Sequence, residues 1–206
     1  MINLFERCLN ARDKYIHTDN GGDYYIEQEG DTLYLLFEKS DGCEDWKNNF
    51  DFPAVPYKDM KPKWMCHRGF LRVWKAMRDD IEAYVAERLK NHPEIKKIVC
   101  IGYSHGATLS AFATEDMEYL HGEAYDVRGY GFGCPRFLWG VVPNDVKLRL
   151  RNFVAVRNIP DIVTHVPPML FGFRNAGTLI KIGKRGRYSP VKAHYPSAYK
   201  EELKNN

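Results

Sequence analysis

The feature that most constrains the fold is a sharp junction between a predicted strand and a predicted helix. Residues 98–101 form an apolar run typical of a buried strand, and residues 105–120, rich in Ala and Leu, have the composition of a helix. Between them stands Gly102-Tyr103-Ser104-His105-Gly106, which has the pattern Gly-x-Ser-x-Gly. A serine at the tip of such a turn takes a strained backbone conformation that exposes its hydroxyl, and only glycine is small enough two positions before and after it. We therefore expect a nucleophile elbow at Ser104, with Gly102 and Gly106 as its glycines.

The rest of the chain alternates predicted strands and helices. Residues 23–38 contain two strand-like pieces around a turn, and residues 127–132 and 152–156 are also strand-like. Residues 70–90 have apolar side chains at helical spacing and end before a proline, while Gly122 is placed to cap the helix that follows the elbow. This alternation predicts the α/β class, with a mostly parallel central sheet flanked by helices.

Length and composition fit one domain. The chain has 206 residues, of which 44% are hydrophobic, and it contains no internal repeat or long polar linker, so we expect residues 1–206 to form a single domain. No apolar run approaches the roughly 20 residues that a membrane-spanning helix needs. Residues 1–13 lack the uninterrupted apolar stretch of a secretory signal. This predicts a cytoplasmic location and leaves a secreted, already trimmed form open.

Cysteine usage and charge argue against other classes of protein. The five cysteines are odd in number, widely spaced and without a Cys-x-x-Cys pair, so neither a disulfide framework nor a zinc site is predicted. The net charge of +3 is too small to favour nucleic acid as a partner. The charge is unevenly distributed, since residues 1–60 contain thirteen acids and six Lys or Arg, whereas residues 162–200 contain seven Lys or Arg and no acid. Such asymmetry marks an anionic partner in some proteins and only solvated loops in others.

A serine hydroxyl becomes a good nucleophile only when a base takes its proton. With an elbow serine, the expected chain order is serine, then acid, then histidine. His121 ends the helix that leaves the elbow, about four turns from the serine, which is too far. We expect the His105 side chain to point away from the hydroxyl and to serve in packing. His165 and His194 remain as candidate bases.

The candidate acids after the elbow are Asp116, Asp126, Asp145 and Asp161. Asp161 follows the predicted strand over 152–156 and so lies at the carboxyl end of that strand. Catalytic groups of open α/β sheets gather at the carboxyl ends of strands. His165 would then share its loop and face the serine with difficulty, so His194 is the better base. Taken singly, Asp161 fits a turn cap and His194 fits a surface histidine equally well. Together with the elbow they form a predicted triad.

Short motifs across residues 30–200 resemble those of one family, in the same order. The resemblance is to the class 3 lipases, the group that includes the secreted fungal triacylglycerol lipases. The matching segments are Phe37-Glu38-Lys39-Ser40 with Asp45-Trp46 and Asn49, His67-Arg68-Gly69-Phe70, the elbow, Gly131-Phe132-Gly133-Cys134-Pro135-Arg136, residues 158–167 and His194-Tyr195.

This resemblance implies the α/β-hydrolase fold and hydrolysis of lipid or small-molecule carboxylic esters. It carries over Ser104, Asp161 and His194 as the triad. It also implies an oxyanion hole made by the backbone N–H of His105 and by Ser40, through its backbone N–H and its hydroxyl. The chain departs from the family at Glu38-Lys39, where the family has Arg-Gly. A glycine that eases the turn into the hole is thereby lost, and one missing oxyanion donor costs about 10²–10³-fold in turnover.

The expected mechanism is two-step acyl transfer, which requires no metal ion and no organic cofactor. A thioesterase or an acyltransferase would use the same triad. The altered Glu38-Lys39 pair leaves a further alternative, a non-catalytic module that binds a lipid or protein partner. Residues 50–65, aromatic and proline-rich, fit a lid or acyl pocket as well as ordinary packing. The basic region that ends beside His194 motivates a hypothesis of peripheral contact with anionic lipid, and the sequence leaves the oligomeric state open.

Overall fold

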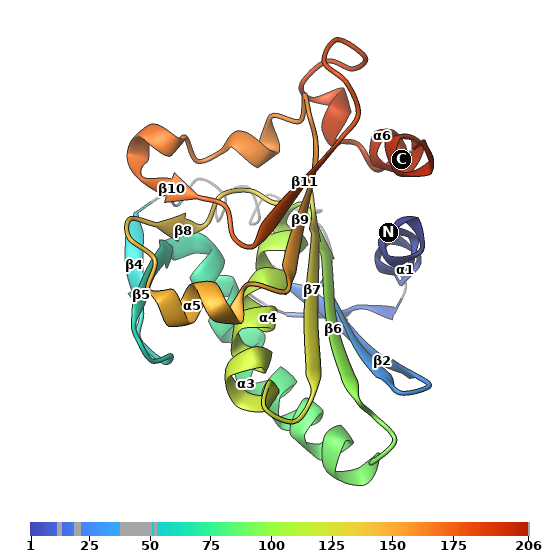
Figure 1. Cartoon of the computed structure of the whole chain (residues 1–206), viewed down its shortest axis with the longest axis vertical. Helices are drawn as coiled ribbons and strands as arrows, with labels where there is room; N and C mark the ends of the chain where they lie inside the picture. The colour runs from blue at the N-terminus through green and yellow to red at the C-terminus, as the bar shows by residue number, and fades with distance from the viewer. Residues whose placement is uncertain (12–13, 19–21, 38–50, 52, 206) are drawn as a thin grey trace.

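The computed structural model describes residues 1–11, 14–18, 22–37, 51 and 53–205. Within them, seven strands form a central sheet in the order β1-β2-β3-β6-β7-β9-β11 (Figure 1). Neighbours from β3 to β11 pair in parallel, and only β1 and β2 are antiparallel to their neighbours. The mostly parallel sheet that the sequence predicts is therefore present. The strand bounds are β1 (Ile16–His17), β2 (Asp23–Glu29), β3 (Thr32–Phe37), β6 (Lys97–Tyr103), β7 (Asp126–Phe132), β9 (Phe153–Asn158) and β11 (Thr178–Ile182).

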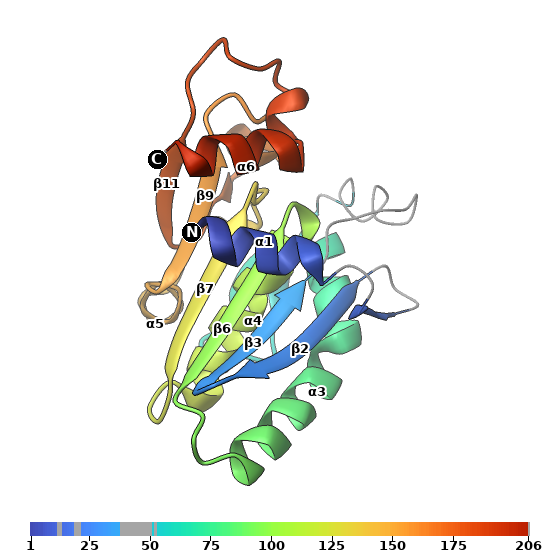
Figure 2. The same ribbon diagram turned by 90° about the vertical axis from the view of Figure 1, so that its right-hand side faces the viewer.

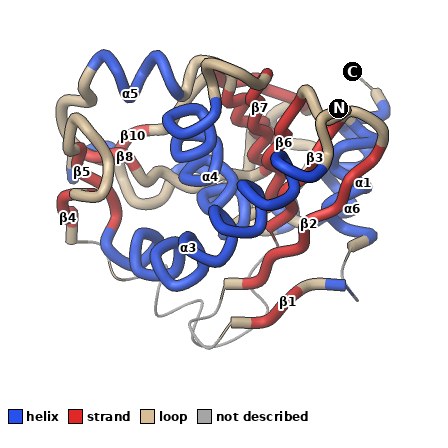
Figure 3. The backbone as a smooth tube through the Cα atoms, turned by 90° about the horizontal axis from the view of Figure 1, so that it is seen from below, coloured by secondary structure: helices blue, strands red, loops and turns tan. Residues whose placement is uncertain are grey.

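Helices cover both faces of this sheet. One face carries α1 (Ile2–Asn10) and α6 (Pro196–Lys204), which contact each other, and the other carries α3 (Arg68–Asn91) and α4 (His105–His121) (Figures 2 and 3). A shorter helix, α5 (Asn144–Arg149), packs against α4. The chain thus has the helix–sheet–helix layers of an α/β protein.

The central strand β6 shows why both faces need covering. Its side chains alternate, so that Ile98 and Cys100 belong to the core beneath α3 and α4, whereas Val99 and Ile101 belong to the core beneath α1 and α6. All four side chains are at most 7% exposed. Because successive side chains of a strand point to opposite faces, an uninterrupted apolar run requires apolar partners on both sides.

The helices follow the sequence pattern closely. In α3 the buried side chains recur at helical spacing, and the helix ends before Pro93, which cannot continue it. In α4 the first thirteen residues, His105 to Met117, are buried all round, as expected for a helix between the sheet and α3. The predicted cap at Gly122 is confirmed. Gly122 is the C-cap of α4 with φ −63°, which is not left-handed, and a Cβ there would lie 2.5 Å from the Glu118 carbonyl oxygen.

A second, antiparallel sheet of the described residues lies beside the first, with strand order β10-β8-β5-β4. Its strands are β4 (Ala54–Tyr57), β5 (Trp64–His67), β8 (Leu138–Trp139) and β10 (Phe173–Arg174). Tyr57, Met60 and Trp64 are at most 2% exposed. Of the two interpretations of residues 50–65, these side chains therefore fit ordinary packing, whereas Phe50 and Phe52 lie outside the described residues.

Candidate active site

The turn from β6 into α4 has the geometry of a nucleophile elbow. Ser104 has φ 58° and ψ −121°, and it is the only non-glycine residue with positive φ in the described part of the chain. Such a conformation costs on the order of 1–3 kcal/mol and persists only where the surroundings impose it. A Cβ on Gly102 would lie 2.0 Å from the Gly106 carbonyl oxygen, so the turn closes only with glycine at that position.

The structure brings Ser104, His194 and Asp161 together in one chain of hydrogen bonds. Ser104 Oγ lies 2.8 Å from His194 Nε2, and His194 Nδ1 lies 2.8 Å from Asp161 Oδ2. The serine comes from the elbow, the acid from the loop after β9, and the histidine from η4 (Lys192–His194). Because a carboxylate only accepts hydrogen bonds, the contact with Asp161 assigns a proton to His194 Nδ1. His194 Nε2 is then free to accept the serine proton.

Asp161 is fully buried and has two further donors. The Tyr199 hydroxyl donates to Oδ2 at 2.6 Å, and the Val163 backbone N–H donates to Oδ1 at 2.9 Å. The same tyrosine oxygen accepts the backbone N–H of Asn158, the last residue of β9, at 3.1 Å. Burial and the nearby carboxylate raise the pKa of Tyr199 well above its ordinary value, so it stays a donor at neutral pH. Both oxygens of this buried carboxylate therefore accept hydrogen bonds from groups other than His194.

The imidazole of His194 is held between two other residues. The Tyr103 ring stacks on it with ring centroids 5.2 Å apart and planes 22° apart, and the Tyr103 hydroxyl donates to the His194 carbonyl oxygen. On another side, a Cβ added to Gly133 would lie 2.9 Å from His194 Cε1. In addition, the Asn158 side-chain amide donates to the carbonyl oxygen of Ala193 at 3.0 Å. The ring orientation is therefore fixed by packing as well as by the hydrogen bond to Asp161.

Of the two residues expected to form the oxyanion hole, His105 lies among the described residues and Ser40 does not. His105 is the first residue of α4, so its backbone N–H lies at a helix N-terminus, where the dipole favours negative charge. Its side chain is 2% exposed and packs on Phe70, with ring centroids 5.4 Å apart. Burial, and then the neighbouring His67, lower the pKa of His105 to about 4, which keeps the ring neutral. Ser40 lies outside the described residues, as do Glu38 and Lys39.

A family model described as lipase (class 3) matches residues 34–171, which is more than half of the chain. The chain belongs to the class 3 lipase family. The family suggested by the ordered motifs of the sequence is thus confirmed.

Several curated relatives of the chain are fungal proteins. It is 28% identical over 149 residues to a lipase of Rhizomucor miehei, covering 71% of this chain and 40% of the relative. It is 29% identical over 161 residues to the secreted mono- and diacylglycerol lipase 1 of Fusarium solani, covering 78% and 44%. A plant relative is phospholipase A1-IIalpha of Arabidopsis thaliana, 27% identical over 156 residues, with 62% and 37% covered. The chain therefore spans less than half the length of these relatives.

Solved structures confirm the α/β-hydrolase fold of the chain. A fungal lipase–inhibitor complex aligns with a TM-score of 0.76 at 19% identity, covering 94% of this chain and 88% of the other. The propeptide complex of Rhizomucor miehei lipase aligns with a TM-score of 0.72 at 20% identity, covering 95% and 73%. At these identities the likeness concerns the fold alone.

The other candidate residues of the sequence have contacts outside the hydrogen-bond chain of Ser104, His194 and Asp161. His165 follows Asp161 in η2 (Val163–His165), and its Nδ1 and carbonyl oxygen lie against the Arg136 guanidinium. Asp116 is buried in α4, where it accepts hydrogen bonds from other side chains. Asp126 pairs with Arg128. Among the described residues, no three His, Cys, Asp or Glu side chains converge in a way that could hold a metal ion.

Sequence reasoning missed the residues that surround the triad, namely Tyr103, Gly133, Asn158 and Tyr199. Tyr103 stands inside the elbow motif and Gly133 and Asn158 stand inside matched segments, so position was a usable signal for these three. Tyr199 had no such signal, because α6 brings it to Asp161 from 38 residues away.

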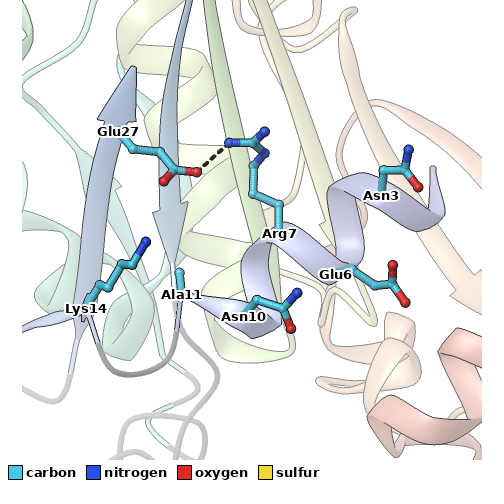
Figure 4. A pocket seen from close by; sticks show the side chains of 7 residues that line it. All are labelled: Asn3, Glu6, Arg7, Asn10, Ala11, Lys14 and Glu27. Atoms are coloured by element: carbon cyan, nitrogen blue, oxygen red, sulfur yellow. Dashed lines mark hydrogen bonds and ion pairs between the residues drawn. The ribbon is translucent and has the colours of Figure 1, made fainter. Parts of the chain in front are cut away.

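A surface pocket of about 330 Å³ lies beside α1 (Figure 4). Its lining residues are distant in sequence from the elbow, the loop that carries Asp161 and η4. An ion pair between Arg7 and Glu27 crosses it, and Arg7 also lies over the Tyr34 ring at 4.0 Å. None of the triad residues lines this pocket. Its lining residues are Asn3, Glu6, Arg7, Asn10, Ala11, Lys14 and Glu27.

Proposed function

We propose that this chain hydrolyses carboxylic esters by acyl transfer, with Ser104 as nucleophile, His194 as general base and Asp161 as the acid that orients it. The observation that carries the proposal is the hydrogen-bond chain from Ser104 Oγ through the imidazole to Asp161, with both contacts at 2.8 Å. Membership of the class 3 lipases and the strained elbow support it.

In the first step, Ser104 Oγ forms a bond to the ester carbonyl carbon while its proton passes to His194 Nε2. The imidazolium that forms is stabilised by Asp161, whose carboxylate also accepts hydrogen bonds from Tyr199 and Val163. The carbonyl oxygen becomes an oxyanion, and the backbone N–H of His105 at the start of α4 is our proposed donor to it. Ser40 is the proposed second donor. Collapse of this intermediate breaks the bond to the alcohol oxygen, which leaves with the proton from Nε2.

In the second step, water replaces the alcohol. His194 Nε2 takes one water proton as the water oxygen attacks the acyl carbon, and the released serine oxygen then recovers that proton from Nε2. The products are a carboxylic acid and the free enzyme. No metal ion or organic cofactor takes part in the proposed steps.

The proposed substrates are lipid esters, with smaller esters as surrogates. Relatives named as acylglycerol lipases and as a phospholipase A1 support the lipid class without distinguishing among its members. The basic segment over 162–200 adds a proposed preference for anionic head groups. Equal turnover of neutral and anionic lipid esters presented in the same micelles would remove that preference.

The test is hydrolysis of p-nitrophenyl esters of increasing chain length, together with fluorophosphonate labelling. Wild type should turn over and be labelled, and Ser104→Ala should lose both. Ser197→Ala, an exposed serine of α6, is the matched control and should keep both. If wild type neither turns over nor is labelled, the chain is the non-catalytic binding module. Preferred turnover of thioesters, or transfer to an added alcohol in place of water, would favour the thioesterase or acyltransferase alternative.

The compartment is a separate question. The structure contains no helix, among its described residues, that is both long enough and apolar enough to cross a membrane. Two relatives are named as secreted lipases. The cytoplasmic location stays a prediction of the sequence, without support from these relatives, and fractionation of cells expressing the full-length gene product would decide it.

A further inference from the structure

A run of backbone carbonyl groups in the loop after β9 faces two arginine residues. The loop carries Asp161, and the arginines are Arg136, between β7 and β8, and Arg157 of β9. The run lies in η2 and the turn that follows it, outside any strand, so each carbonyl group needs a donor from elsewhere in the fold. The carbonyl groups are those of four consecutive residues, Thr164, His165, Val166 and Pro167.

Arg136 supplies the donors for three of these four carbonyl groups. Its Nη1 donates to the His165 carbonyl oxygen at 2.6 Å and to that of Pro167 at 3.1 Å, and its backbone N–H donates to that of Val166 at 2.8 Å. Its Nη2 lies 3.4 Å from His165 Nδ1. The residue is only 6% exposed. Because a guanidinium presents its donors in a rigid planar fork, Arg136 fixes the positions of these acceptors relative to one another.

The two arginines have the acid loop as their partner in place of a carboxylate. In the described part of the chain, every hydrogen bond from the guanidinium groups of Arg136 and Arg157 goes to this loop, and none goes to an Asp or Glu. Burial lowers the pKa of both groups, and Arg157 lowers that of Arg136 further, whereas Tyr199 and Asp161 oppose the fall at Arg157. A buried cation is costly unless it is paired. The loop and the two cations therefore stabilise each other.

The segment that contains Arg136 also contacts the proposed base. Residues 133–136 follow the end of β7, and a Cβ on Gly133 would lie 2.9 Å from His194 Cε1. The Gly133 N–H donates to the Val156 carbonyl oxygen of β9 at 2.9 Å, which fixes this end of the segment to the sheet. One short stretch of backbone thus touches the imidazole at one end and holds the loop of Asp161 at the other.

We propose that Arg136 is a positioning residue for the proposed triad. Through the carbonyl oxygens of His165 and Pro167 it holds the acid loop where the Asp161 carboxylate meets His194 Nδ1. His165 then serves as an acceptor for Arg136 and not as a base. The kinetic consequence rests on the proposed function, whereas the contact between acid and base is measured without substrate.

The kinetic test is the replacement Arg136→Met, which retains an unbranched stem and removes the charge and all side-chain donors. We expect kcat for p-nitrophenyl esters to fall about 10- to 100-fold with KM changed less than about twofold, because a displaced acid misorients the base without removing contacts to the substrate. Arg136→Lys keeps the cation without the fork and should recover part of kcat. Arg157→Met removes one contact, to Thr164 at 3.3 Å, and should lower kcat only several-fold.

Arg149→Met is the matched control, because Arg149 is also nearly buried but is paired within the helix layer. Its side chain is 12% exposed, and its Nε donates to Glu115 Oε1 at 2.6 Å. Both methionine variants should lower the urea midpoint of unfolding. Only Arg136→Met should lower kcat per folded molecule, with the folded fraction taken from the same urea curves.

A second readout needs no substrate. The proton of His194 Nδ1, shared with Asp161 at 2.8 Å, should give a low-field ¹H NMR resonance that is absent in His194→Ala. Arg136→Met should shift this resonance upfield or remove it, and Arg149→Met should retain it. If wild type hydrolyses no ester, the proposed function fails, and the resonance alone decides whether Arg136 positions Asp161.

Two results would overturn the proposal. One is a kcat of Arg136→Met no lower than that of Arg149→Met, and the other is an unchanged low-field resonance in Arg136→Met. Should Arg136→Met not fold, Arg136→Lys takes its place in both measurements. A kcat and a resonance equal to those of wild type in Arg136→Lys then overturn the proposal, since the fork would not be needed to position the acid.

Discussion

At the scale of single residues, the proposed triad is positioned by a buried tyrosine. Tyr199 joins the Asp161 carboxylate to the end of β9, since its oxygen donates to Oδ2 and accepts the Asn158 N–H. Asp161 itself is on the loop that leaves β9, so one hydroxyl ties the loop to the strand. We regard Tyr199 as a positioning residue, because it acts on the base through Asp161.

Replacing Tyr199 by phenylalanine should remove this tie while keeping the ring. We expect kcat for p-nitrophenyl esters to fall about tenfold with little change in KM, and the free energy of unfolding to fall by about 1–3 kcal/mol, as for a buried hydrogen bond to a charged group. Steady-state kinetics and urea unfolding measure the two effects. Tyr195→Phe, at a 52% exposed tyrosine, is the control. An unchanged kcat in Tyr199→Phe would show that Asp161 needs no such tie.

The buried His105 ring should make stability depend on pH. Its pKa falls from about 6.5 to about 4 on folding, so between these values the unfolded chain binds a proton that the native protein does not. The free energy of unfolding should therefore be retained above about pH 6.5 and decrease as the pH falls toward 4.

His105→Leu isolates this contribution. We expect the loss of stability between about pH 7 and about pH 5 to be smaller in the variant by about 2 kcal/mol, whatever its stability at neutral pH. Urea unfolding followed by tryptophan fluorescence at the two pH values provides the comparison. If both proteins lose the same amount, the ring is accessible to protons in the native state.

At the scale of elements, one steric contact joins β6 to α4. The Cβ that Gly102 lacks would overlap the backbone of Gly106 and Ala107, at 2.0 and 2.7 Å, and backbone atoms cannot move aside without opening the elbow. The strained φ of Ser104 depends on this close approach.

Gly102→Ala should therefore cost about 3 kcal/mol or more and abolish fluorophosphonate labelling of the fraction that still folds. Gly30→Ala is the control, since Gly30 has φ +58° but no atom within 4 Å of the added Cβ, so the left-handed backbone alone is penalised, by about 1 kcal/mol. Urea unfolding measures both. A cost at Gly102 no larger than that at Gly30 would show that the backbone of Gly106 and Ala107 moves aside for the added Cβ, and that close approach does not require glycine at 102.

At the scale of the whole molecule, Asp116 connects three elements that are distant in sequence. Its buried Oδ2 accepts Tyr57 of β4 at 2.6 Å, and Trp74 and Arg78 of α3 at 3.1 and 2.7 Å. Burial raises the pKa of this carboxyl group while Tyr57 and Arg78 oppose the rise. The network joins the second sheet to both helices on that face.

Asp116→Ala should lower the free energy of unfolding by about 3–5 kcal/mol, because Arg78 loses its buried partner. Adding Arg78→Met should recover part of this loss. Asp126→Ala, which breaks the exposed pair with Arg128, should cost less than about 1 kcal/mol. Guanidinium unfolding at neutral pH ranks the three variants. A small cost for Asp116→Ala would show that the contact of β4 with α3 and α4 is stabilised by apolar packing alone.

The sequence by itself determined the parts of this protein that depend on near neighbours in the chain. The apolar run of β6, the glycine spacing of the elbow and the helical spacing of α3 are local patterns, and each predicts its element because backbone sterics and side-chain periodicity act over a few residues. Chain order and the position of Asp161 after a strand then selected three triad candidates, which the structure places in mutual contact.

The tertiary structure alone decided the contacts between distant segments. Nothing near Tyr199 in sequence indicates that its hydroxyl meets Asp161. Asp116 lies far along the helix that leaves the elbow, and its hydrogen-bond partners are 38 to 59 residues away in sequence. The second sheet likewise depends on how β8 and β10 pair across more than thirty residues. Such contacts depend on which surfaces of the helices and sheets pack together. The total free energy of burying all of these surfaces decides that packing, and no single stretch of sequence contains it.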